Sequence, residues 1–141
     1  DERLNSCDLN KVSLFLVNEV EAEQMTREHS KAAMPEKLLE KYPRGKFVLT
    51  LGSEGSVYRD ADGQYRQGIF QVKTVDTTAA GDTFTGYFLA SLLQGKEIPQ
   101  ALETAAAASA IAVSRPGASS SIPFMEEVEK FMKNQLSGRE V

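Results

Sequence analysis

Residues 75–88 constrain the fold more than any other part of the chain, because two hydrophobic periodicities meet there. Over residues 70–75 apolar and polar side chains alternate, which predicts a half-buried strand. From Phe84 onward the apolar residues recur at helical spacing, which predicts a helix over about residues 80–94. The intervening sequence T-T-A-A-G must therefore form a tight turn that ends at the start of a helix.

The predicted helix start has small side chains. Thr77 or Thr78 can cap the helix through a hydroxyl group. The next three residues, Ala79, Ala80 and Gly81, leave the first backbone N–H groups almost uncovered. Uncovered N–H groups at a helix N-terminus, together with the helix dipole, favour the binding of an anion such as phosphate. The turn is therefore a candidate anion site.

Asp82 follows this turn directly. A carboxylate in the first turn of a helix is favoured by the helix dipole, typically by about 0.3–1 kcal/mol, so Asp82 has a purely structural explanation. Beside an anion site, however, a carboxylate can deprotonate a hydroxyl group while the N–H groups stabilise charge on a phosphoryl group. A kinase needs both of these functions.

The run D-T-T-A-A-G-D-T-F-T-G-Y-F, from Asp76 to Phe88, resembles the second signature of the ribokinase (PfkB) family of carbohydrate kinases. The resemblance implies phosphorylation of a sugar hydroxyl group, with ATP and Mg²⁺ as cofactors. It also implies that Asp82 is the catalytic base. Ala79, Ala80 and Gly81 would then form the anion hole around the transferred phosphoryl group.

Two further segments resemble motifs of the same family. The run N-E-V-E resembles the family motif N-x-x-E, which implies that Asn18 and Glu21 place Mg²⁺ and phosphate through water. Taken alone, the run is the solvated start of a helix. The run T-L-G-S-E-G resembles the T-x-G-x-x-G segment that lines the nucleotide, which assigns Thr50, Gly52 and Gly55 to ATP. Taken alone, it is a turn between two strands.

A third segment, Ser114–Ser121, has the composition of a flexible linker and resembles the family's [ST]-R-x-G-A segment. In that segment backbone carbonyl groups and a hydroxyl group help to hold a monovalent cation such as K⁺ beside the anion hole. Family members differ in whether they need this cation. The positions that the resemblance assigns to it are Asp76, Thr78, Ala112, Arg115, Gly117 and Ser121.

The remaining patterns predict strands that alternate with helices. The expected elements are buried strands at Leu14–Val17 and Phe47–Leu51, a hairpin around Asp60–Gly63, and helices over residues 30–42, from Pro99 and from Pro123. We expect Gly81 and Gly86 to pack against the alanine run Ala105–Ala108. Alternating strands and helices indicate an α/β fold. The resemblance implies a three-layer α/β/α ribokinase-like (Rossmann-like) fold with a mostly parallel sheet plus a β-hairpin.

Length and charge limit the classes of function. The chain has 141 residues, which we expect to form one domain: a C-terminal fragment with the nucleotide-binding and catalytic half of the family's fold. A net charge of -4 and a pI near 5.1 argue against nucleic-acid binding. No run approaches the ~20 apolar residues of a membrane helix, and Cys7 is the only cysteine. We therefore expect a cytoplasmic protein without membrane partners.

The sequence thus predicts an ATP-dependent sugar kinase, whose parent forms a homo-oligomer and whose residues 1–141 are inactive alone. The chain has no G-x-x-x-x-G-K-[ST] run, which excludes a P-loop kinase. Two alternatives stay open. One is a nucleotide-binding or structural fragment without catalysis, and the other is a nucleoside or vitamin-precursor kinase of the same superfamily.

Overall fold

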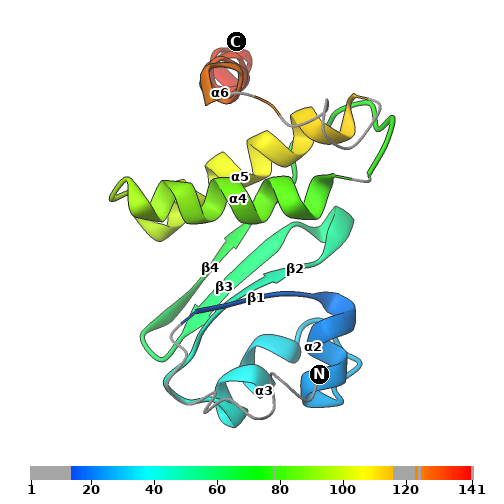
Figure 1. The fold of residues 1–141 in the computed structure, drawn as a ribbon, viewed down its shortest axis with the longest axis vertical. Coiled ribbons are helices and arrows are strands. Elements are labelled where there is room, and N and C mark those ends of the chain that lie inside the picture. Colours follow the sequence, from blue (N-terminus) through cyan, green and yellow to red (C-terminus); the bar gives the residue numbers. More distant parts are fainter. Residues whose placement is uncertain (1–13, 78, 116–122, 124, 141) are drawn as a thin grey trace. The chain divides into compact units, whose positions relative to one another are not determined.

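The computed structural model describes residues 14–77, 79–115, 123 and 125–140, with only the backbone given for 135–140. The chain divides into two compact units, Asp1–Arg66 and Gln67–Val141 (Figure 1). Each unit has a hydrophobic core of its own. None of the helices in the described ranges combines the length and the apolarity that crossing a membrane would take.

The first unit is built on a sheet with the strand order β1-β2-β3-β4. Its strands are β1 (Leu14–Asn18), β2 (Lys46–Thr50), β3 (Ser56–Asp60) and β4 (Gly63–Gln67). β1 and β2 are parallel, whereas β2 and β3 are antiparallel. The two apolar runs predicted as buried strands form β1 and β2, next to each other. Phe47, Val48 and Leu49 of β2 are buried as predicted, whereas in β1 only Phe15 is buried and its apolar neighbours are half-buried. The predicted hairpin is also confirmed, as β3 and β4.

Two helices, α2 (Glu19–Thr26) and α3 (Met34–Lys41), pack against this sheet (Figure 1). The rings of Phe15 and Phe47 stack at 5.0 Å between centroids, and Leu38 of α3 is buried in the same core. Full burial of a large apolar side chain typically contributes about 1.5–3 kcal/mol, so these contacts fix the helices on the sheet. α3 begins later than predicted, at Met34, where Pro35 suits the first turn.

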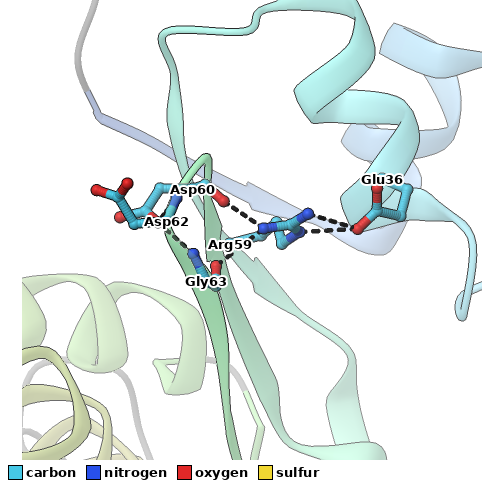
Figure 2. A network of polar contacts seen from close by, with 5 residues as sticks. All are labelled: Glu36, Arg59, Asp60, Asp62 and Gly63. Carbon is cyan, nitrogen blue, oxygen red and sulfur yellow. Dashed lines mark hydrogen bonds and ion pairs between the residues drawn. The ribbon is translucent and has the colours of Figure 1, made fainter.

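A polar network holds the hairpin to α3 (Figure 2). The Arg59 guanidinium contacts Glu36 Oε1 at 2.8 Å through both Nε and an Nη atom. It also donates hydrogen bonds to the carbonyl groups of Asp60 and Gly63. In the turn, Asp60 Oδ1 accepts the backbone amides of Asp62 and Gly63, each at 2.9 Å. These bonds close the tight turn that the D-A-D-G sequence predicts.

The second unit consists of α4 (Ala80–Leu93), α5 (Ile98–Val113) and α6 (Met125–Glu140), together with the irregular segment that precedes α4. α4 packs against α5, and α5 packs against α6. The core lies where Phe70, Ile111 and Val128 meet, and the Phe131 ring closes it. The three predicted helices are confirmed.

The strand predicted over residues 70–75 is wrong, because the structure has no strand between 68 and 77. The Val75 and Asp76 amides bond to the carbonyl group of Val113, at 2.6 and 3.0 Å, instead of to a neighbouring strand. Phe70 is buried against the edge of the Phe131 ring, whereas the side chain of Val75 is 53% exposed. The alternation of the sequence therefore reflects one-sided burial against helices.

The expected packing of Gly81 and Gly86 against the alanine run is also wrong. Both glycines are exposed, and a Cβ atom added to either would meet no atom within 4 Å. The alanines Ala105–Ala108 are buried, as a packed helix face requires. The N-cap of α4 is Ala79 and not Thr77, whereas Thr78, the other expected cap, lies outside the described residues.

Candidate active site

The residues that the sequence assigns to the site fall into three groups. The first unit holds Asn18, Glu21, Thr50, Gly52 and Gly55. The second unit holds Asp76, Ala79, Ala80, Gly81, Asp82, Ala112 and Arg115. Thr78, Gly117 and Ser121 lie outside the described residues.

In the first unit the two predicted motifs share one edge of the sheet. Asn18 and Thr50 are the last residues of β1 and β2, and they stand opposite each other in the parallel register. Beyond these residues the chain enters α2 on one side and the short 3-10 helix η1 (Gly52–Glu54) on the other. Ligands of open α/β sheets bind beyond the carboxyl ends of parallel strands. The structure therefore brings the five predicted residues of this unit to the edge that corresponds to the ligand-binding edge of open α/β sheets.

Asn18 and Glu21 are joined by a capping box at the start of α2. The Glu21 amide donates to Asn18 Oδ1 at 2.8 Å, and the Asn18 amide donates to Glu21 Oε1 at 3.0 Å. Both residues are exposed. The box satisfies backbone groups of the first turn and holds the carboxylate in one orientation at the strand end.

The segment Gly52–Gly55 requires glycine at both ends. Gly52 has a φ of 59° and Gly55 a φ of 88°, values that other residues rarely adopt. The Gly55 amide donates to the Gly52 carbonyl at 3.1 Å, and the Gly55 carbonyl accepts the Leu51 amide at 2.8 Å. Gly52 is exposed, and no atom lies within 4 Å of the place where its Cβ atom would stand. The backbone of this segment is therefore open to a ligand.

In the second unit the start of α4 carries the predicted base and anion hole. Ala79 is buried and Ala80 is half-buried, whereas Gly81 and Asp82 are exposed. The Ala80 amide donates to the Thr77 carbonyl at 3.2 Å, which closes the turn ahead of the helix. Because Asp82 lies in the first turn and is exposed, its carboxylate is accessible to a ligand at the helix N-terminus.

The predicted cation ligands of this unit lie around the end of α5. Asp76 bonds through its amide to the carbonyl group of Val113, the residue after Ala112. The Ala112 carbonyl accepts the Arg115 amide at 3.2 Å, and the Arg115 side chain pairs with Glu127. Within the described residues, no three His, Cys, Asp or Glu side chains gather where they could hold a metal ion. The K⁺ site stays a prediction.

Lys31 lies at this edge of the first unit, and no sequence pattern pointed to it. Its Nζ atom lies 3.0 Å from Glu19 Oε2 and 2.8 Å from Glu54 Oε2. Glu19 follows Asn18 directly, and Glu54 lies between Gly52 and Gly55, so Lys31 connects the two predicted motifs of the first unit. No spacing rule relates these three residues, because they are distant in sequence.

A search of protein-family models matches residues 4–125 to the pfkB family carbohydrate kinases. The chain belongs to this family. Among curated relatives of this pfkB chain, the ribokinase of Schizosaccharomyces pombe is 47% identical over 98 residues, which are 69% of this chain and 31% of that protein.

Solved structures of ribokinases resemble the pfkB chain across most of its length. Thermotoga maritima ribokinase is 38% identical with a TM-score of 0.79, and the match covers 86% of this chain and 42% of that one. Arabidopsis thaliana ribokinase, solved with ribose and ATP, is 30% identical with a TM-score of 0.83, and the match covers 89% and 42%. The predicted ribokinase-like fold is thereby confirmed. The chain spans less than half the length of these relatives.

Proposed function

We propose that the chain is the nucleotide-binding and catalytic part of an ATP-dependent sugar kinase. The observation that carries the proposal is the start of α4, where Gly81 and Asp82 are exposed in the first turn and the residues just before them have small side chains. This arrangement lies within the D-T-T-A-A-G-D run, in a chain of the pfkB carbohydrate kinase family. The ribose and ATP bound by Arabidopsis ribokinase support a sugar acceptor and a nucleotide donor.

In the proposed reaction Asp82 accepts the proton of a sugar hydroxyl group, whose oxygen attacks the terminal phosphorus of ATP. The bond between this phosphorus and the bridging oxygen breaks, and ADP leaves. The anion hole predicted at Ala79, Ala80 and Gly81, together with the helix dipole, would stabilise the charge on the transferred phosphoryl group. The Ala80 amide bonds to the Thr77 carbonyl group, which leaves the Ala79 and Gly81 amides as its donors. The base and the anion hole are therefore neighbours on one helix turn.

We assign the nucleotide and its magnesium ion to the first unit. The open glycine segment with Gly52 and Gly55, next to Thr50, would hold ATP. Mg²⁺ keeps most of its waters and takes oxygen partners, so the exposed oxygens of Asn18 and Glu21 fit a hydrated ion. When bound, Mg²⁺ neutralises phosphate charge, while Asn18 and Glu21 orient its waters.

The test is the transfer of phosphate from ATP to a panel of sugars that includes ribose, measured as ADP formation. It compares residues 1–141 with a longer protein that contains them. We expect sugar-stimulated turnover only from the longer protein, because the chain spans less than half the length of its relatives. A longer protein that forms no ADP with any sugar would contradict the kinase proposal.

The same partial coverage favours a second candidate function, nucleotide binding without catalysis. Calorimetric titration of residues 1–141 with Mg-ATP distinguishes the two candidates when it is combined with the turnover assay. Binding of ATP by residues 1–141, with no turnover from the longer protein, would favour this second function over the kinase.

A further inference from the structure

Lys31 joins two segments that fold separately along the chain. Glu19 is the first residue of α2, directly after the capping residue Asn18. Glu54 is the last residue of η1, directly before Gly55. Because the Lys31 ammonium lies within 3.0 Å of a carboxylate oxygen of each, it ties the start of α2 to the glycine segment.

The sheet anchors the glycine segment at its two ends, because Thr50 pairs with Asn18 on one side and with Ser56 on the other. Between these ends, its backbone hydrogen bonds run within the segment and to Leu51. Glycine loses more conformational freedom on folding than any other residue, so a segment with two glycines has many competing conformations. An ion pair from outside the segment reduces their number.

Lys31 also changes the charge at this edge. Glu19 and Glu54 place two carboxylates beside the residues that we assign to a polyphosphate, and uncompensated carboxylates repel phosphate. The ammonium between them offsets one of the two negative charges and so reduces this repulsion. Hydrogen bonds to Glu54, and then to Glu19, raise the pKa of Lys31, so the positive charge is present throughout the neutral range.

The exposure of the three side chains indicates that their ion pairs order the neighbouring segments and add little to the stability of the whole unit. The side chain of Lys31 is 42% exposed, and exposed ion pairs contribute little to the stability of a whole protein. Loss of the ammonium would therefore leave the unit folded while it releases the glycine segment.

We propose that Lys31 is a positioning residue, which holds the segment Gly52–Gly55 against the start of α2 and offsets part of the negative charge of Glu19 and Glu54 where the nucleotide phosphates would bind. The inference rests on the proposed function, because it requires that this edge of the sheet binds ATP. Lys31 acts through the glycine segment and is not assigned a contact with the reacting atoms.

The variants Lys31→Met and Lys31→Arg test the proposal, with Lys37→Met as the matched control. Lys37 is a comparably exposed lysine that pairs with Glu40 on α3 at 3.5 Å. The first readout is amide hydrogen exchange at residues 52–55 in residues 1–141 without nucleotide. The second is the affinity for Mg-ATP, together with KM for ATP and kcat in the longer protein.

We expect Lys31→Met to accelerate exchange at residues 52–55 and to weaken ATP binding, each by roughly threefold to fivefold, as loss of an exposed ion-pair network allows. KM for ATP should rise while kcat stays unchanged. Lys31→Arg should restore both readouts, and Lys37→Met should change neither.

Two results would overturn the proposal in distinguishable ways. If wild-type protein binds ATP and Lys31→Met leaves exchange at residues 52–55 unchanged, the positioning role is wrong and the proposed function stands. If exchange accelerates but neither residues 1–141 nor the longer protein binds ATP, the proposed function is wrong, and the nucleotide role of Lys31 fails with it.

Discussion

Asn18 and Glu21 exchange two hydrogen bonds at the start of α2, of 2.8 and 3.0 Å, so each residue has a structural role besides the one proposed toward Mg²⁺. A substitution that removes a cap typically costs about 1 kcal/mol of stability. A loss of activity in such a variant could therefore come from lower stability or from weaker Mg²⁺ binding. The chosen variants must distinguish these two causes.

Glu21→Gln separates the two roles, because glutamine also completes a capping box but carries no charge. We expect the free energy of unfolding to stay within about 0.5 kcal/mol of wild type, while the Mg²⁺ concentration for half-maximal activity of the longer protein rises. Chemical denaturation and Mg²⁺ titration measure the two quantities. Glu23→Gln, on the same helix, is the control, and an equal response of both variants would remove Glu21 from the magnesium site.

Asp82→Asn tests the proposed base. Asparagine keeps the size of the side chain but cannot accept a proton at neutral pH, so we expect kcat of the longer protein to fall by roughly 10²–10⁴-fold. The affinity for ATP should stay near that of wild type. Glu103→Gln, an exposed acid on α5, controls for the loss of one negative charge. Near-normal kcat in Asp82→Asn would show that another group takes the proton.

Gly52→Ala tests the backbone conformation of the glycine segment. A residue with a side chain at a φ of 59° costs roughly 1–2 kcal/mol, so we expect the free energy of unfolding to fall by about 1 kcal/mol. No clash adds to this cost, because the Cβ atom would meet open space. Gly63→Ala is the control, since its Cβ atom also meets open space and its φ is not positive. Equal stability of the two variants would exclude backbone strain.

The hairpin should weaken in acid because of Asp60. Partial burial alone would raise the pKa of this carboxyl group, but hydrogen bonds from the Tyr58 hydroxyl and from the Asp62 and Gly63 amides outweigh it and lower the pKa. A carboxyl group with a lowered pKa in the folded state contributes stability above its unfolded pKa of about 3.9. This contribution is lost as the pH falls through the lower, folded pKa.

Amide exchange at residues 58–63, followed as the pH falls below about 4, checks this expectation. Burial and the nearby Asp60 raise the pKa of Tyr58, so its hydroxyl group remains a donor throughout the titration. Asp60→Asn keeps an acceptor but does not titrate, and protection in this variant should not change with pH beyond the intrinsic exchange rate. The same acid response in both proteins would assign the effect to another group.

The sequence predicted those elements of the fold whose hydrophobic pattern matches the contacts that they make in the folded chain. The runs at Leu14–Val17 and Phe47–Leu51 became β1 and β2, because a continuous apolar run is typical of strands that pair in parallel. The strand predicted over residues 70–75 was wrong because an alternating pattern indicates which side chains are buried. It does not indicate which groups the backbone amides bond to. There the carbonyl group of Val113 took the amides that a strand would have offered to a neighbour.

The residues of the candidate site also fall into those that a sequence motif indicates and those that only contacts in the folded chain reveal. Asn18, Thr50 and Gly52 were assigned from segments that resemble family motifs, and the parallel register places these segments side by side. Lys31 could not be found, since its partners Glu19 and Glu54 meet it only after the segments between them have folded. Isolated charges carry no periodicity, and only the coordinates reveal such a contact.

The register of β1 against β2 makes this edge intolerant of one kind of change. Successive side chains of a strand point to opposite faces, so deletion of a single residue within β1 would turn Phe15 out of the core and move Asn18 away from Thr50. Changes of length in the crossover between the two strands leave that alignment intact. Natural variation in this chain should therefore show gaps in the crossover, away from Lys31, far more readily than inside either strand.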